Sequence, residues 1–509
     1  MLSTSWRKLF WVLVLVHLTT PGFGQMVLRV CDDVEEPTSL NPYRVFSEKV
    51  ITIIQQFIEG LVRFDSEGNL ESGLAEKWTR INDKTVRFYL RKNVEFHNGE
   101  KFGAHCVKYS IEKYIDPDTK YPGAGYLNVI SQVNVIDENT IDIITNVPDG
   151  LILNRLAAFG KIVPCKYYTE VGADVFAKLP VGTGPFEFKS WNPGKEIEMI
   201  AFKKYWNPSY PKVDTLKFKF VAADDQVDAL FANEVDILTS LPGTRTLDVQ
   251  KDPDTTVVKR PTFYTVAGAF NTSRLPLSNR QVRQALNMAI DKEAIIRYDL
   301  LGNGRPIATL TMPFEFGHND QLEPYPYDIE GARDILKEQY PNGFTLRVFM
   351  KVNAQRTGQV LTQQLAKIGV QLESTLVTDA EIFKYLEDKN QWDILLADCP
   401  NPFYHSFFIQ SAFLYSKSPF ALSKNEGFDS RLEKGMSTLD PAQQKKAFED
   451  LDKYVYDQAL CLFTYQRIRT YGLRRGVKFT PYVSGMPYFH DALIKSEKMI
   501  GVTKSSPLP

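Results

Sequence analysis

The chain has 509 residues, of which 43% are hydrophobic and 24% are charged, and its formal net charge is −1. This is the composition of an ordinary globular protein, and the length corresponds to about two to four domains. The balanced charge excludes a general attraction to nucleic acids or anionic membranes, so we expect no nucleic-acid partner.

The N-terminal segment has the pattern of a secretory signal. Arg7 and Lys8 precede the apolar run Leu9–Leu18, and a Pro-Gly pair follows. This run is shorter than the roughly 20 apolar residues that a membrane-spanning helix requires. We therefore predict that residues 1–24 are a cleaved signal peptide and that the protein is periplasmic; an uncleaved anchor or a buried helix is the alternative.

The first third of the mature chain alternates short strands with short helices. The patterns predict a strand over 27–31, a helix over 50–61, strands over 61–64 and 85–90, a helix over 107–114, and two strands within 129–145. Elements of this length and order indicate an α+β unit between about residues 60 and 180.

The stretch PVGTGPFEFKSW (180–191) contains two glycines spaced as in a phosphate-binding loop. Such loops open a helix or continue into Gly-Lys-Ser/Thr. Here Pro185 follows the second glycine, and residues 186–189 alternate as a strand, which argues against nucleotide binding. We predict a hairpin over 186–201, with the glycines giving φ/ψ freedom and close packing where the chain re-enters its first domain.

The second half has longer helical patterns. Apolar residues spaced at three and four predict a helix over 282–290. A strand over 345–350, a helix over 357–368 ending at Gly369, and a strand over 370–377 form a βαβ unit, which implies a parallel sheet. We place a boundary between two lobes near residues 268–275 and expect a ligand to bind between them.

Motifs for catalysis or for metal binding are not found in the sequence. There is no Gly-x-Ser-x-Gly elbow, and none of the six histidines lies in a His-Glu-x-x-His arrangement. An odd and scattered set of cysteines without a Cys-x-x-Cys pair indicates neither a disulfide scaffold nor a structural zinc site. We expect no cofactor and no enzymatic activity. The five cysteines are Cys31, Cys106, Cys165, Cys399 and Cys461.

A collinear series of motifs, from about residue 27 to residue 490, resembles the extracytoplasmic solute-binding proteins of peptide/nickel-type ABC importers. The motifs are EEPTSLNP (35–42), VRFYLRKNVEFHNGEKFGAHCVKYS (86–110), PVGTGPFEF (180–188), KKYWNP (203–208), ALFANEVDIL (229–238), FNTSRLPLSNRQVRQALNMAIDKEAII (270–296), YDIEGARDIL (327–336) and LAKIGVQLE (365–373). One departure is Ala104-His105-Cys106-Val107, where the family usually has Ala-Glu-Asp-Val; we interpret it as local variation.

The resemblance implies an α/β fold, namely a two-lobed periplasmic-binding protein of type II and of the large peptide-binding class, with an extra α+β subdomain in the first lobe. The implied segments are the signal peptide (1–24), lobe 1 (25–60), the inserted subdomain (61–178), the second segment of lobe 1 (179–268), lobe 2 (269–480), and a return to lobe 1 with a C-terminal tail (481–509).

The ligand segment of the family resembles WDILLADCPNPFYH (392–405). Asp398 is the best match to the acidic residue that receives a peptide's amine, because a buried carboxylate makes a strong charge-assisted bond with an ammonium group; capping of a loop is the alternative. The further pocket candidates are Trp392, Cys399, Asn401 and Tyr404. His405 is a metal-ligand candidate, because the nickel-binding branch has a histidine in this region.

The function implied by the resemblance is the capture of short peptides between two lobes and their delivery to the membrane permease of an ABC transporter. We expect the protein to act as a monomer. A nickel or metal-chelate carrier on the same scaffold is the alternative reading, and an exported peptide hydrolase or chaperone is a third.

Overall fold

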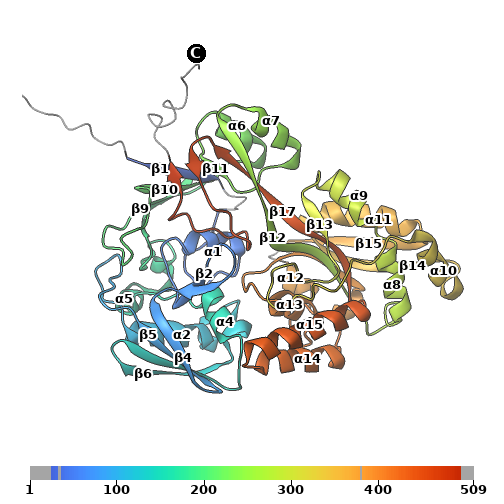
Figure 1. The fold of residues 1–509 in the computed structure, drawn as a ribbon, viewed down its shortest axis with the longest axis horizontal. Helices are drawn as coiled ribbons and strands as arrows, with labels where there is room; N and C mark the ends of the chain where they lie inside the picture. Colours follow the sequence, from blue (N-terminus) through green and yellow to red (C-terminus); the bar gives the residue numbers. More distant parts are fainter. Residues whose placement is uncertain (1–24, 32–35, 379–380, 495–509) are drawn as a thin grey trace, which may run out of the picture.

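The computed structural model describes residues 25–31, 36–378 and 381–494 (Figure 1). The predicted signal peptide lies outside the described residues. Within those ranges, no helix combines the length and the apolar character that crossing a bilayer would require.

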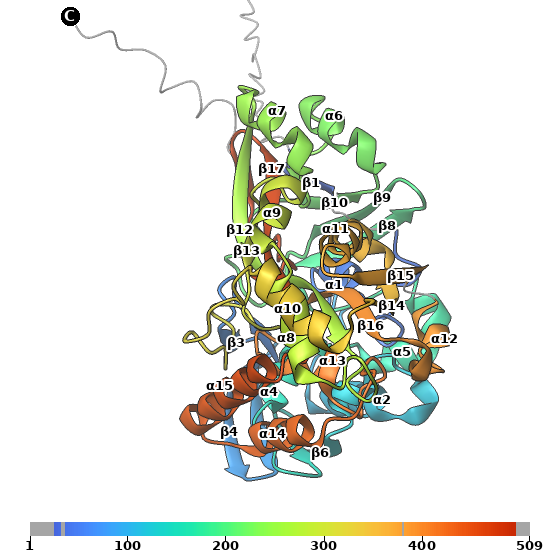
Figure 2. The same ribbon diagram turned by 90° about the vertical axis from the view of Figure 1, so that its right-hand side faces the viewer.

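A ribbon of two long strands organises the molecule. β12 (Thr255–Phe270) and β17 (Cys461–Arg474) pair antiparallel and run through the centre (Figures 1 and 2). They belong to an eleven-stranded sheet with the order β15-β14-β16-β12-β17-β11-β1-β10-β9-β8, in which β13 also pairs with β17. One continuous sheet therefore joins segments from both halves of the chain.

One end of the ribbon carries strands from the first half. These are β1 (Val27–Cys31), β8 (Phe186–Asn192), β9 (Glu196–Ala201), β10 (Thr215–Lys219) and β11 (Ile237–Leu238), with helices α6 (Gln226–Phe231) and α7 (Thr246–Lys251) beside them (Figure 2). The register Phe186↔Ala201 to Asn192↔Glu196 confirms the predicted hairpin.

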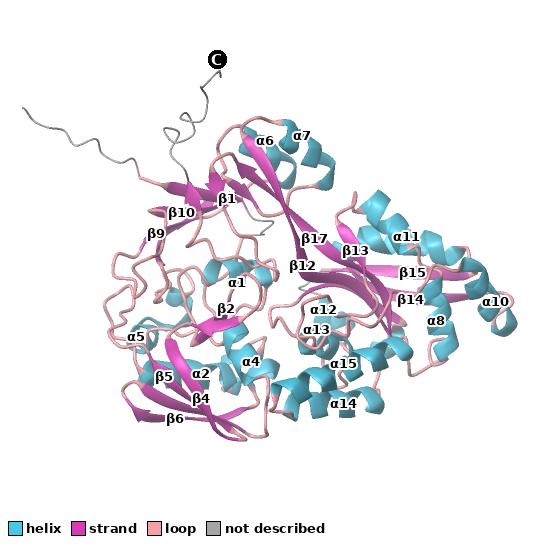
Figure 3. Ribbon diagram, in the orientation of Figure 1, coloured by secondary structure: helices cyan, strands magenta, loops and turns pink. Residues whose placement is uncertain are grey.

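The other end carries strands from the second half. β14 (Phe344–Lys351) pairs in parallel with both β15 (Val370–Val377) and β16 (Ile394–Pro400), which confirms the predicted βαβ unit. Helices gather around these strands (Figure 3). The other elements here are α8 (Arg280–Met288), α9 (Lys292–Ala294), β13 (Gly304–Pro306), α10 (Ile329–Gln339), α11 (Gln355–Ala366), α12 (Ile382–Tyr385), α13 (Phe407–Leu414), α14 (Glu426–Ser437) and α15 (Pro441–Asp457).

A separate four-stranded antiparallel sheet, with the order β4-β5-β7-β6, lies within the segment predicted to be α+β. Its strands are β4 (Ala75–Asn82), β5 (Thr85–Leu90), β6 (Ile130–Asp137) and β7 (Thr140–Thr145). The neighbouring elements are β2 (Val62–Phe64), β3 (Leu70–Ser72), α2 (Ala104–Ile115), α3 (Ala124–Leu127), α4 (Ile152–Phe159) and α5 (Cys165–Phe176). A short pair, β18 (Val477–Lys478) and β19 (Leu493–Ile494), lies near the end of the described chain.

The helix predicted over 50–61 is shorter in the structure, where α1 covers Glu48–Ile54. The backbone beyond it forms bonds to other segments: the carbonyl of Phe57 accepts from the amide of Gly184 at 3.0 Å, and that of Glu59 accepts from Ile162 at 2.8 Å. The predicted end of the helix was wrong. The apolar spacing continues to residue 61, but the backbone carbonyls of Phe57 and Glu59 bond to distant segments and not within the helix.

The two glycines of the GTG stretch pack directly against this segment. A Cβ atom on Gly182 would lie 1.9 Å from the carbonyl oxygen of Phe57, and one on Gly184 would lie 2.7 Å from the Phe57 Cα. Positive φ is found at other glycines but not at these two. Close packing therefore explains why glycine is needed at both positions. The other predicted reason, an unusual φ/ψ conformation, does not apply to them.

Candidate functional site

Asp398 lies at the edge of the sheet where two parallel strands end. It is near the end of β16, and Lys351 is the last residue of the neighbouring β14. The carboxyl ends of parallel strands meet at one edge, which is where open α/β sheets usually bind ligands. Side chains that are far apart in the sequence are thereby brought together.

The Asp398 carboxylate has three partners. Its Oδ1 lies 3.0 Å from the ammonium group of Lys351, and its Oδ2 accepts hydrogen bonds from the hydroxyl of Tyr264 and, at 3.3 Å, from the side-chain amide of Asn353. The side chains of Asp398 and Lys351 are only 8% and 18% exposed. We call Asp398, Lys351, Tyr264 and Asn353 the Asp398 cluster.

The electrostatics of the cluster keep Asp398 ionised. Burial by itself would raise the pKa of this carboxyl, but the charge of Lys351 and the hydrogen bonds from Tyr264, Lys351 and Asn353 hold it below its usual value. Burial, with the negative charges of Asp398 and Glu48, raises the pKa of Tyr264. The phenol thus remains a donor, and the cluster contains a nearly buried ion pair.

Further charged groups reach this region from other elements. The guanidinium of Arg467, on β17, lies 5.4 Å from the centre of the Tyr264 ring. Arg469, on the same strand, donates to the Gly485 carbonyl at 2.6 Å and lies 3.7 Å from the carboxylate of Glu48, the first residue of α1. This region therefore combines the ribbon and the strands β14 and β16 with a carboxylate from α1.

Two of the pocket candidates lie away from the Asp398 carboxylate. Trp392 precedes β16 by two residues, and its indole donates to the Tyr385 carbonyl at 2.9 Å. Six residues of extended chain place it roughly 20 Å from Asp398. Cys399 follows Asp398 in the strand and so points to the opposite face, where burial raises the pKa of its thiol. Both side chains are buried in the core.

Asn401 and Tyr404 are buried and have structural partners. The amide of Asn401 donates to Glu315 and to the His405 carbonyl, both at 2.9 Å, and so shapes the turn after β16. The hydroxyl of Tyr404 donates to Ser484 at 2.7 Å, and its ring packs 4.3 Å from that of Phe64. Neither side chain is bonded to Asp398.

His405 is enclosed by aromatic rings. The ring centres of Phe316 and Phe448 lie 4.7 and 4.5 Å away, and the imidazole Nδ1 accepts from the Phe407 amide at 3.0 Å. Burial, with the positive charge of Arg155, lowers its pKa to about 3. Within the described ranges, the one group of His, Cys, Asp and Glu side chains close enough to hold a metal is Glu100 with Cys106 and Cys165, and His405 is not part of it.

Lys351, Tyr264 and Asn353 are members of the Asp398 cluster that were not predicted from the sequence. A usable signal was present for Lys351, because it directly follows the strand predicted over 345–350 and so lies at a carboxyl end. The tyrosine on β12 gave no such signal, since its position beside Asp398 depends on the antiparallel register Tyr264↔Pro400.

Comparison with known proteins gives a consistent result. Residues 69–418, more than half of the chain, match the family model described as bacterial extracellular solute-binding proteins, family 5 middle. The glutathione-binding protein GsiB of Pectobacterium atrosepticum is 30% identical over 363 residues, which cover 69% of this chain and 70% of that protein.

Solved structures of other binding proteins resemble the fold of this chain over nearly its whole length. The binding protein AgaA from A. tumefaciens R10, in complex with agropinic acid, has a TM-score of 0.79 at 26% identity and covers 92% of this chain and 99% of its own. DppA from Helicobacter pylori, in complex with the peptide STSA, has a TM-score of 0.81 at 23% identity and covers 93% and 99%. These likenesses confirm the predicted fold, a type II periplasmic-binding protein of the peptide-binding class. The chain belongs to the family 5 bacterial extracellular solute-binding proteins.

Proposed function

We propose that this member of an ABC-importer family of substrate-binding components acts in the periplasm as a monomer. It captures short peptides between its two lobes and delivers them to a membrane permease. The observation that carries the proposal is the nearly buried Asp398–Lys351 ion pair at the carboxyl edge of the sheet. The printed ligands of the relatives, glutathione and the peptide STSA, support it because both contain amide-linked amino acids.

The ion pair suits a ligand that carries both charges. An entering ammonium group would approach the Asp398 carboxylate, and Lys351 would then pair with a carboxylate of the ligand. Because the two protein charges neutralise one another before binding, neither has to be left buried and unpaired. We also propose that residues 25–268 and residues 269–480 form the two lobes, and that the ligand enters between them.

A calorimetric titration tests the role of Asp398. The probes are a short free-amine peptide, its N-acetylated form, and reduced glutathione. We expect Asp398→Asn to weaken the free-amine peptide by roughly 10- to 100-fold, the value of a desolvated charge-assisted bond, and to affect the acetylated form much less. Asp334→Asn, an exposed change in α10, is the matched control and should alter neither affinity.

Equal losses for both peptides would remove Asp398 from this role. If no peptide raises the melting temperature while Ni²⁺ with free histidine does, the peptide proposal fails and the metal-chelate alternative replaces it. In that case His405→Gln should abolish the shift caused by the nickel complex.

A further inference from the structure

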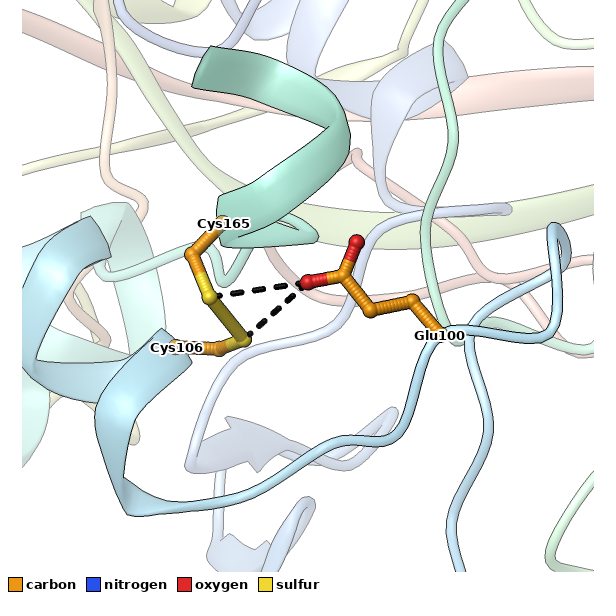
Figure 4. Close-up of side chains that lie close together, drawn as sticks. All are labelled: Glu100, Cys106 and Cys165. Atoms are coloured by element: carbon orange, nitrogen blue, oxygen red, sulfur yellow. Dashed lines mark hydrogen bonds between the residues drawn. A yellow bond between two sulfur atoms is a disulfide. The ribbon is translucent and has the colours of Figure 1, made fainter. Parts of the chain in front are cut away.

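Cys106 and Cys165 are joined by a disulfide in the α+β segment, far along the chain from the Asp398 cluster (Figure 4). Cys106 is the third residue of α2, and Cys165 is the first residue of α5. They are 59 residues apart in sequence, and their Cα atoms are 5.0 Å apart, inside the range that a disulfide bridges without moving the backbone. The residue that looked like local variation in a family motif is therefore half of a cross-link.

Glu100 positions the start of α5 beside this cross-link. Its two carboxylate oxygens accept from the amides of Lys166 and Tyr167, at 3.0 and 3.1 Å, and so cap the helix. One of these oxygens lies 3.6 Å from the Cys106 sulfur and 3.5 Å from that of Cys165. A carboxylate so close opposes the thiolate form that the helix N-terminus would otherwise favour.

His97 extends the attachment from the same loop. Its Nδ1 accepts from the Gly182 amide at 3.3 Å, so Nε2 carries the proton and donates to the Gly184 carbonyl at 3.0 Å. The backbone amide of His97 also donates to the Gly182 carbonyl at 2.9 Å. Segment 165–184 is thus held at its start by the disulfide and Glu100, and at its end by His97.

We propose that the Cys106–Cys165 disulfide is a covalent clip, formed after export, that fixes segment 165–184 to segment 96–106 whatever ligand is bound. Its closure breaks two S–H bonds and joins the two sulfurs, while two electrons and two protons pass to a disulfide-bearing oxidant, whose own S–S bond breaks to give a dithiol. Such bonds persist in oxidising compartments outside the cytoplasm. The oxidised pair cannot supply the thiolates that a metal would need, so clip and metal site exclude one another.

Thiol counting tests whether the bond forms. Full-length protein exported to the periplasm is denatured without reductant, alkylated and mapped by mass spectrometry. We expect three free thiols, at Cys31, Cys399 and Cys461, and a cross-linked pair of peptides. Five free thiols, or one zinc ion retained per chain by Cys106 and Cys165, would overturn the proposal.

Reduction tests what the bond does. Dithiothreitol should lower the melting temperature of the wild-type protein by roughly 2–4 °C and speed hydrogen exchange in 165–184. The double variant Cys106→Ser, Cys165→Ser should start at the lower temperature and not respond to reductant, which makes it the matched control. A wild-type protein whose melting and exchange are unchanged by reduction contradicts the clip.

A second variant tests the positioning role of Glu100. In the reduced protein, Glu100→Gln should raise the alkylation rates of Cys106 and Cys165 near pH 7 by roughly 3- to 10-fold, because the nearby negative charge is gone. A loss of packing alone would not change the dependence of these rates on pH. Rates that equal those of the wild type at every pH would contradict this role.

Discussion

Glu315 is a carboxyl group that the fold keeps almost completely from water, with 4% of its surface exposed. The amide of Asn401 donates to it at 2.9 Å, and the Met312 amide donates at 3.3 Å. Burial raises the pKa of Glu315 to about 8, and the charge of Asp452 acts in the same direction. The protonated acid is therefore the form that suits the folded protein.

The change Glu315→Gln should stabilise the protein in a pH-dependent way. The folded state holds this proton up to about pH 8, while an unfolded glutamate releases it near pH 4.5. Folding stability therefore falls as the pH rises between these values, and a neutral amide at this position removes that loss. We expect a gain at pH 8 that exceeds the gain at pH 5 by about 1–3 kcal/mol, measured by denaturant titration at both pH values.

A change at an exposed site provides the control for this experiment. Glu76 lies on β4 and faces solvent, and Glu76→Gln should shift the stability equally at pH 5 and pH 8. A gain for Glu315→Gln that is the same at both pH values would show that this carboxyl titrates normally in the folded protein.

The contact between the GTG stretch and the segment after α1 makes one position intolerant of a side chain. Gly182→Ala would bring a Cβ atom 1.9 Å from the Phe57 carbonyl oxygen, so backbone must shift. We expect a loss of at least about 2 kcal/mol in urea unfolding. Gly125→Ala is the matched control, because nothing lies within 4 Å of its new Cβ and its helical position favours alanine.

If Gly182→Ala and Gly125→Ala unfold at the same denaturant concentration, the close approach in segment 180–184 does not limit stability. In Gly182→Ala we expect the hydrogen bonds between residue 182 and His97 to be lost. This loss should appear as faster hydrogen exchange in segment 180–184 alone.

Elements were predictable from sequence where the pattern and the partner were both local. Alternation and turn residues gave the hairpin over 186–201, and a 3.6-residue period between two strands gave the parallel βαβ unit. The early end of α1 was not predictable, because the carbonyls that follow it bond to residues more than 100 positions away. The disulfide was missed for the same reason, since no spacing rule connects Cys106 with Cys165.

The candidate site divides in the same way. Family motifs indicated Asp398, and the structure places Lys351 and Tyr264 against its carboxylate; its role in ligand binding stays a prediction. Trp392 and Cys399 are pocket candidates because they are near Asp398 in the sequence. In the structure, Trp392 lies before the start of β16, and Cys399 points to the opposite face of the sheet from Asp398. Lys351 and Tyr264 come from other strands, and only the register of the sheet reveals them.

At the scale of the whole molecule, aromatic side chains of α13 hold the α+β segment against the second half of the chain. The ring of Phe408 stacks on Tyr126 at 5.1 Å, and the side-chain amide of Asn154 donates to the Phe403 carbonyl at 2.9 Å. If ligand entry requires the lobes to separate, these contacts exist only in the closed form and contribute to its population.

The change Phe408→Ala should therefore weaken ligand binding without touching the Asp398 cluster. Loss of this packing lowers the closed fraction, and the apparent affinity falls with that fraction. We expect a loss of roughly tenfold or more for peptide, measured by calorimetry, and a larger radius of gyration in X-ray scattering with ligand at fixed concentration. Phe314→Ala, where the side chain is 84% exposed, should change neither quantity. Unchanged affinity in Phe408→Ala would mean that binding does not depend on this contact.

The β12–β17 ribbon has a mechanical consequence. Its register slips twice, between Pro261 and Thr265 and again between Val266 and Gly268, and Tyr264 lies inside the first slip. Irregular pairing is where a strand bends most easily. Tyr264, which donates to Asp398, thus lies in the irregular stretch of β12. If ligand release bends the ribbon there, a ligand bound at Asp398 opposes the bending that would release it.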